Sequence, residues 1–185
     1  MMVARVQTHG MQRTNEGGNM SNSTRREAWV KNLTQPSQWA VRLYRISHNA
    51  HARGHRVLPL AIDALSRIVT GVEIEHTAVV GANFSLRHGL GTVIGQNSVL
   101  GDGCVVHQNV TIGLRRLTDE NHAGSMPRIG DRVCIYAGAV VAGPITIGND
   151  AIIGANAVVL EDVPAGATVV GAKARIILRR TSVED

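Results

Sequence analysis

The chain has 185 residues, of which 44% are apolar, only 3% are aromatic and 20 are glycine, and its net charge at pH 7 is +5. A core with so few large rings must be thin and repetitive, which disfavours a Phe-rich sandwich and a Leu-rich helical bundle. The length suits one ordinary domain with a modest extension.

Charge, cysteine content and apolar runs bound the function further. Basic residues gather near the two ends of the chain, but they do not alternate with aromatic side chains that could stack on bases, so we expect no nucleic-acid partner. Solvated tails or a site for a phosphate-bearing cofactor would each explain these basic ends. Cys104 and Cys134 form neither a disulfide framework nor a zinc motif. No apolar run reaches the roughly 18–20 residues that cross a membrane, so we expect a soluble, cytoplasmic protein.

The chain divides into four segments. Residues 1–22 are polar and rich in Gly and Asn, which is typical of a disordered leader. Residues 23–70 form a helical segment, residues 71–172 carry a repeat, and residues 173–185 form a basic tail.

Two helices, over residues 38–52 and 58–69, are predicted in the helical segment. Pro36 lies near the start of the first helix, and Gly71 ends the second. The apolar residues at helical spacing are Trp39, Leu43 and Ile46 in the first helix and Ile62, Leu65 and Val69 in the second. The two helices would form a small N-terminal cap.

Aliphatic residues then recur every six positions, a period that fits neither a helix nor a simple strand. They are Ile74, Val80, Leu86, Ile94, Leu100, Val106, Ile112, Ile129, Ile135, Val141, Ile147, Ile153 and Val159. A fixed period of this kind is typical of a solenoid, whose units bury their apolar faces by stacking on one another. Three hexapeptides, each a short strand and a corner, would close a triangular coil of about 18 residues.

The period is interrupted twice. Residues 87–91 bulge by two residues, and residues 114–128 are polar and charged and should leave the coil as an extruded loop. His88 lies in the bulge beside glycines that allow another molecule to approach. An imidazole there is suited to remove a proton from an attacking hydroxyl, and Glu73 is placed to fix its tautomer. A histidine with only a surface or structural role is the alternative.

Other polar residues are candidates for lining the same site. The bulge makes one turn 20 residues long, so Leu86 stacks on Val106, Gln108 lies beneath His88, and His107 lies one position away. His107 is expected to line the pocket or the surface, and His122 of the loop either reaches a neighbouring site or is solvated. His48, His51 and His55 have no carboxylate or cysteine to complete a ligand set, so we expect no metal.

Several stretches of the repeat carry a resemblance to a known family. They are GVEIEHTAVVGANFSLRHGLGTVIG from residue 71, QNVTIG from 108, MPRIGDRV from 126 and the closing VPAGATVVGAKARI. Together they resemble the serine acetyltransferase branch of the hexapeptide-repeat acyltransferases. Within that branch the chain looks closer to the short exopolysaccharide O-acetyltransferases of the colanic acid type.

The resemblance implies a mainly β fold, a left-handed parallel β-helix with the two-helix cap and one extruded loop. It also implies a homotrimer with active sites at its subunit interfaces and acetyl-CoA bound between neighbouring coils. The family's catalytic histidine falls on His88 and its partner acid on Glu73. Its groove residues fall on Ala137 and Ala155, with Lys173 near a phosphate. Backbone amides at the bulge or Gly113 would hold the oxyanion.

The chain departs from the family where the acceptor binds. Arg87 stands in place of an aspartate, and Ser125 and Met126 stand in place of an Arg-His pair, groups that hold the ammonium and carboxylate of serine. We therefore predict a sugar or polysaccharide hydroxyl as the acceptor, with Arg87, His107, Gln108 and His122 lining its site. Serine O-acetylation is the alternative. More distant alternatives are a γ-type carbonic anhydrase and a non-catalytic trimeric scaffold.

Overall fold

The computed structural model describes residues 35–115 and 124–171. The predicted leader and basic tail lie outside these residues, as do His122 and Lys173. Within the described part of the chain, no helix is both long and apolar enough to span a bilayer.

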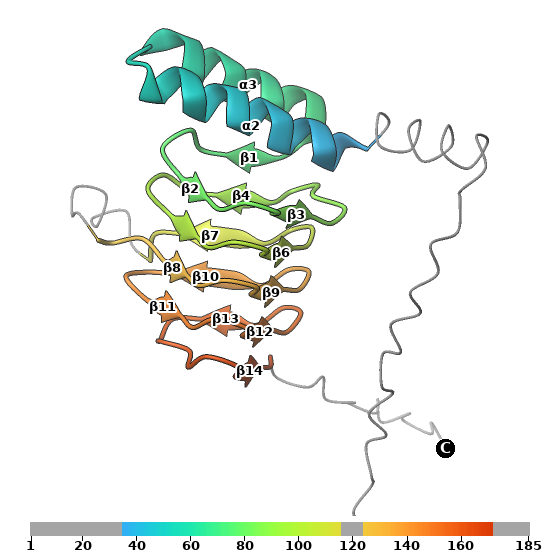
Figure 1. Ribbon diagram of the computed structural model, residues 1–185. Coiled ribbons are helices and arrows are strands. Elements are labelled where there is room, and N and C mark those ends of the chain that lie inside the picture. Colours follow the sequence, from blue (N-terminus) through green and yellow to red (C-terminus); the bar gives the residue numbers. More distant parts are fainter. Residues whose placement is uncertain (1–34, 116–123, 172–185) are drawn as a thin grey trace, which may run out of the picture.

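Short parallel strands stack in three sheets below a pair of helices, as Figure 1 shows. Sheet A contains β1 (Glu73–Ile74), β4 (Val93–Ile94), β7 (Thr111–Gly113), β10 (Val140–Ala142) and β13 (Val158–Val159). Sheet B contains β2 (Val79–Val80), β5 (Val99–Leu100), β8 (Arg128–Ile129) and β11 (Thr146–Ile147). Sheet C contains β3 (Ser85–Leu86), β6 (Val105–Val106), β9 (Cys134–Ile135), β12 (Ile152–Ile153) and β14 (Thr168–Val169). The predicted left-handed parallel β-helix is confirmed.

The register shows how long each turn of the coil is. Val93 pairs with Thr111 and Val140 with Val158, so an uninterrupted turn takes 18 residues. Glu73 pairs with Val93, 20 residues later, because the bulge adds two. The aliphatic side chains at the six-residue period are buried along the axis. In each strand one side chain points inward and the next points outward. The inward side chains of successive turns therefore pack on one another and form one continuous core.

The extruded loop is shorter than predicted at its C-terminal end. Ser125, Met126 and Pro127 are buried, and Arg128 already belongs to β8. The methyl group of Met126 lies against Gly95. The segment from 125 to 128 is therefore part of the coil wall, although its sequence does not follow the six-residue period.

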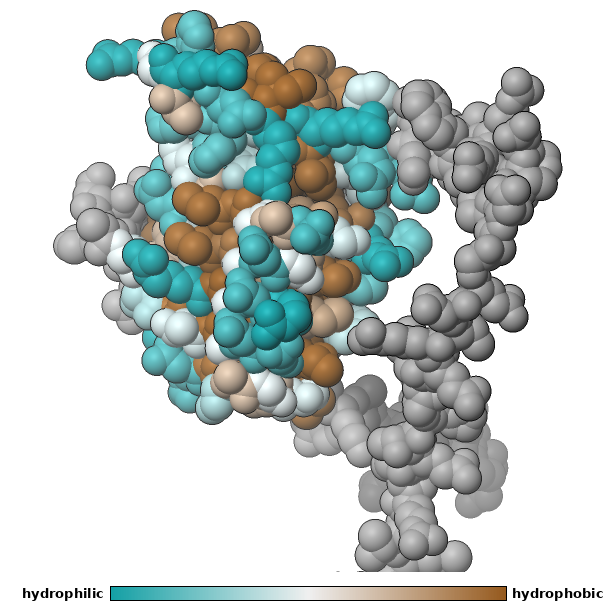
Figure 2. All heavy atoms as spheres, viewed as in Figure 1, coloured by the Kyte–Doolittle hydropathy of each residue, from teal (hydrophilic) through white to brown (hydrophobic). Residues whose placement is uncertain are grey.

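The two helices, α2 (Pro36–Ala52) and α3 (Val57–Thr70), lie across the upper end of the coil (Figure 1). Their existence and bounds match the prediction, and Gly71 ends α3 in the left-handed conformation at φ 66°. Their apolar stripes, however, are not the buried faces. Helix α2 buries Ser37, Ala40, Tyr44, Ser47 and Ala50, and α3 buries Pro59, Ser66 and Thr70. Trp39 and Ile46 of α2 and Leu65 and Val69 of α3 are exposed, and Figure 2 shows apolar surface over the helices.

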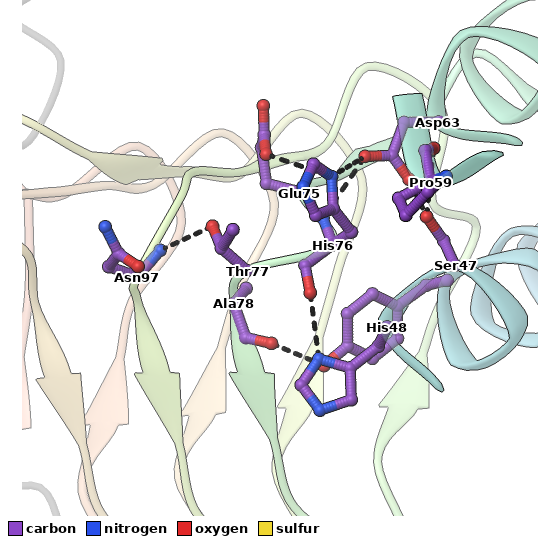
Figure 3. A network of polar contacts seen from close by, with 10 residues as sticks. Ser47, His48, Pro59, Asp63, Glu75, His76, Thr77, Ala78 and Asn97 are labelled. Carbon is purple, nitrogen blue, oxygen red and sulfur yellow. Dashed lines mark hydrogen bonds and ion pairs between the residues drawn. The ribbon is translucent and has the colours of Figure 1, made fainter. Parts of the chain in front are cut away.

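Polar contacts attach the helices to the first turn of the coil. The Tyr44 hydroxyl is buried, donates to the carbonyl of Ala78 at 2.7 Å and accepts from the amide of Val80 at 3.2 Å. Figure 3 shows Asp63 of α3 facing His76, whose Nδ1 and backbone nitrogen lie 2.6 and 3.2 Å from one Asp63 oxygen. The other Asp63 oxygen accepts from Ser47 at 2.6 Å.

Replacing Tyr44 by Phe should lower the free energy of unfolding by about 1–3 kcal/mol, because the carbonyl of Ala78 and the amide of Val80 would stay buried without their partner. Chemical denaturation monitored by circular dichroism measures the change. Tyr136→Phe makes the same chemical change at an exposed ring and should alter stability by less than about 0.5 kcal/mol. Equal effects of the two substitutions would contradict the role of Tyr44.

Candidate active site

The candidate residues lie along one edge of the coil, where each strand of sheet C leads to the next strand of sheet A. We call this the C–A edge; it consists of residues 87–92, 107–110, 136–139 and 154–157. Backbone hydrogen bonds stack these corners: Asn109 donates to Leu90 at 3.0 Å, Gly138 to Gln108 at 3.1 Å, and Asn156 to Ala137 at 3.0 Å.

The register of sheet C sorts the edge into two columns. Leu86 pairs with Val106, Val106 with Ile135, and Ile135 with Ile153. The next residue in each turn therefore forms one column, which contains Arg87, His107, Tyr136 and Gly154. The second residue forms the other column, which contains Gln108, Ala137 and Ala155. The corner hydrogen bond from Asn109 to Leu90 places Leu90 over Gln108, and His88 lies in the bulge just before it. The predicted base and the predicted groove residues thus share one edge of the fold.

The bulge holds His88 in an uncommon backbone conformation. His88 has φ 61°, in the left-handed region, and Gly89 and Gly91 follow at φ 37° and 73°. The amide of Arg87 donates to Val106 at 2.7 Å, and the amide of Gly91 donates to Gly71 at 2.8 Å. Glycine is favoured at Gly91 by its positive φ, and a Cβ atom there would require the Oδ1 of Asn109 to move.

A cavity of about 470 Å³ opens between the bulge and the first turn of α2. Its lining residues are Gln35, Pro36, Ser37, Gln38, Ser85, Leu86, Arg87 and His88. The side chains of both Arg87 and His88 are exposed. The predicted base therefore faces a space large enough for a small acceptor molecule.

His107 lies half-buried below this cavity. Its ring stacks on Tyr136, with 5.0 Å between the ring centroids and 22° between the planes. Burial of the ring, followed by the nearby charges of His88 and Arg87, lowers the pKa of His107 below its ordinary value. The lowered pKa favours the neutral ring of His107, which can donate one hydrogen bond from one nitrogen and accept another at the other.

We expect an NMR titration of the imidazole to give His107 a pKa below the usual histidine value. In Arg87→Gln this pKa should rise, because one positive charge is lost, but only in part, because burial is the larger cause. Arg53→Gln, at the exposed C-terminal end of α2, should leave it unchanged. A His107 pKa at or above the usual value would contradict this description of the site.

Gln108 has an unused polar atom in the second column. Its Oε1 is buried and has no hydrogen-bond partner within the part of the chain that the structure describes. A buried carbonyl oxygen without a partner is unfavourable by about 1–3 kcal/mol, so a bound ligand that donates to it would be stabilised. Sequence reasoning placed Gln108 beneath His88. The stacking of Leu86 on Val106 agrees with the turn length, but the hydrogen bond from Asn109 to Leu90 places Gln108 beneath Leu90, because the two additional residues of the bulge come before Leu90.

Glu73 is not hydrogen-bonded to His88 in the single subunit. Its carboxylate lies 3.4 Å from the Arg67 guanidinium, and both groups are substantially exposed. Glu73 is nevertheless close in the fold, because it begins β1 directly after the Gly71 carbonyl that holds the bulge. That Glu73 orients His88 stays a prediction.

The predicted cofactor residues lie at two different places. Ala155 is exposed and Ala137 half-buried, one above the other on the C–A edge. Gly113 ends β7, at the other end of a sheet A strand from this edge, and open space surrounds the position that its Cβ would take. Tyr136 is a residue that sequence reasoning missed, since a single aromatic side chain at an outward position of the repeat carries no periodic signal.

Comparisons with known proteins agree with the fold. Residues 126–161 match the bacterial transferase hexapeptide (six repeats) family, and residues 72–114 match the hexapeptide repeat of succinyl-transferase. The chain is 39% identical over 155 residues to the serine acetyltransferase of Helicobacter pylori strain J99, covering 83% of this chain and 88% of that protein. The chain belongs to the serine acetyltransferase family of hexapeptide-repeat acyltransferases.

Solved structures extend the comparison to bound ligands. The serine acetyltransferase of Neisseria gonorrhoeae in complex with serine is similar with a TM-score of 0.72 and 34% identity, covering 80% of this chain and 59% of that one. A serine acetyltransferase in complex with CoA matches with a TM-score of 0.67 and 33% identity, covering 77% of this chain and 57% of that one. The chain thus spans less than two thirds of these two structures.

The relatives overturn the predicted acceptor. A sugar or polysaccharide hydroxyl was expected because Arg87, Ser125 and Met126 replace residues that hold serine, but the similar proteins are serine acetyltransferases, and one structure contains serine. The expected closeness to exopolysaccharide O-acetyltransferases is likewise not supported. The error lay in treating three substitutions as a change of substrate class, although residues of α2 line the same cavity.

Proposed function

We propose that this acyltransferase moves the acetyl group of acetyl-CoA to the hydroxyl of L-serine or of a closely related small hydroxy acid. The observation that carries the proposal is the C–A edge, where His88 of the bulge lines a cavity of about 470 Å³ at the top of the same edge that holds Gln108, Ala137 and Ala155. The similarity to enzymes solved with serine and with CoA supports the two substrates.

The chemistry requires one base beside one hydroxyl. His88 removes the proton of the acceptor hydroxyl as its oxygen attacks the thioester carbonyl, and the C–S bond then breaks. The proton returns from His88 to the departing CoA sulfur, so the base is regenerated in each cycle. Glu73 would stabilise the imidazolium that forms between these steps. Gln108, whose Oε1 is free to accept, would bind an N–H or O–H group of a substrate.

Acetyl-CoA would run down the C–A edge from His88. Small side chains at Ala137 and Ala155 leave room for the pantetheine chain, and we place Lys173 near a phosphate group. Gly113 lies at the opposite end of sheet A, so it would join this site from a neighbouring subunit. We therefore propose a homotrimer with its active sites at the subunit interfaces. The exposed outward side chains of Val79, Ile152 and Val158 give the coil apolar surface for such contacts.

Substitution of the three titratable residues separates their roles. At saturating acetyl-CoA, His88→Ala should lower kcat for L-serine by about 10²-fold or more, the scale of a lost general base. Glu73→Gln should lower kcat less, because it keeps a hydrogen-bond acceptor and loses only the charge. His107→Ala should have the smallest effect, because its ring stacks on Tyr136 beside the site.

Calorimetry is the control for these variants, since acetyl-CoA binding should survive in all three if the groove is made by other residues. An active His88→Ala enzyme together with an inactive His107→Ala enzyme would show that His107 is the base. Absence of O-acetylserine from the wild-type reaction would reject L-serine as the acceptor.

A further inference from the structure

The cavity beside His88 has an unbalanced charge. Among the residues that the structure describes, its lining includes one permanent cation, Arg87, and no carboxylate. Among the described residues Arg87 forms no ion pair, and the nearby Glu73 pairs with Arg67. A guanidinium without an acidic partner at the wall of a cavity favours an anionic ligand.

Helix α2 adds to this preference. The helix begins at Pro36 without a side-chain cap, and its first residues form the opposite wall of the cavity. The positive end of the helix dipole therefore points toward the same space as Arg87. Both contributions favour negative charge, and neither the helix nor the bulge supplies a carboxylate that would hold an ammonium group.

The position of Arg87 also fixes which part of an acceptor it meets. Arg87 and His88 are consecutive in the chain and both line the cavity. In serine the hydroxyl oxygen and the carboxylate carbon are separated by two carbon atoms, so a molecule whose hydroxyl lies at His88 has its carboxylate close enough for Arg87. An ammonium at the same site would lie near a guanidinium and an imidazole, which is electrostatically unfavourable.

We infer that Arg87 selects the acceptor by its carboxylate, and that the acceptor's ammonium group is dispensable. This inference rests on the proposed O-acetyl transfer to a small hydroxy acid and names the group that is recognised. The substrate class would therefore include hydroxy acids without an amino group, whereas amino alcohols without a carboxylate would be poor acceptors.

Three acceptors that differ by one group each test the inference with acetyl-CoA as the donor: L-serine, 3-hydroxypropionate, which lacks the ammonium, and ethanolamine, which lacks the carboxylate. We expect kcat/KM for 3-hydroxypropionate to lie within about tenfold of that for serine or above it, and kcat/KM for ethanolamine to be lower by about 100-fold. Arg87→Gln should raise KM about 10- to 100-fold for the two carboxylates, the scale of a lost charge-assisted hydrogen bond. It should not raise KM for ethanolamine, and it should raise kcat/KM for this acceptor if anything, because the repulsion between its ammonium and the guanidinium is lost.

Arg53→Gln is the matched control, an exposed arginine at the far end of α2, and it should leave all three acceptors unaffected. The inference would be overturned, with serine acetylation left intact, by a kcat/KM for ethanolamine equal to that for serine. An equal effect of Arg87→Gln on the kcat/KM of all three acceptors would overturn it in the same way. Acetylation of 3-hydroxypropionate without any acetylation of serine would support the inference and reject serine as the substrate. If acetyl-CoA is not consumed with any of the three acceptors, both the inference about Arg87 and the proposed acetylation of serine are rejected.

Discussion

The constraint on which the structure depends is the stacking of equivalent residues in successive turns of the coil. Because an uninterrupted turn takes 18 residues, each position lies over the same position of the next turn. Side chains at inward positions must therefore be aliphatic. The residues of each corner must form hydrogen bonds with the corners above and below it. At another corner, the carboxylate of Asp102 accepts from Ala82, Asp131 accepts from Asp102, and Asn149 accepts from Asp131.

The proposed site lies at a place where this stacking rule is relaxed. Additional residues cannot enter a stacked wall, so the bulge at 87–91 forms at a corner of the coil. The bulge puts Arg87 and His88 at a cavity, and the regular turns below it keep Gln108, Ala137 and Ala155 on the same edge of the coil. The rigid part of the fold thus sets the position of a site whose chemistry comes from an irregular part.

The same constraint explains what the sequence predicted well. Residues from Ile74 to Val159 recur at a fixed period because each packs on its equivalent, so core, turn length and the stacking of Leu86 on Val106 followed from spacing alone. The helices have no such constraint. Their apolar side chains at helical spacing suggested a buried face, yet α2 buries Tyr44 and Ser47, whose hydroxyls bond to residues far away in the chain.

The acceptor could not be predicted from single positions for a related reason. A cavity formed by two segments far apart in sequence gains its charge from both, so Arg87 alone did not reveal that Gln35, Ser37 and Gln38 lie opposite it. Glu73 likewise meets Arg67 of α3, a contact that spacing within the repeat did not indicate. Only the packing of the helices on the first turn brings these groups together.

The central claim is that one edge of the coil aligns the base with the cofactor. A crystal structure of the protein with bound CoA tests it most directly. We expect the CoA sulfur within about 3–4 Å of the His88 imidazole, the distance that proton transfer requires. The pantetheine chain should run past Ala137 and Ala155 and contact a neighbouring subunit. CoA bound along another edge of the coil, with its sulfur far from His88, would contradict the account.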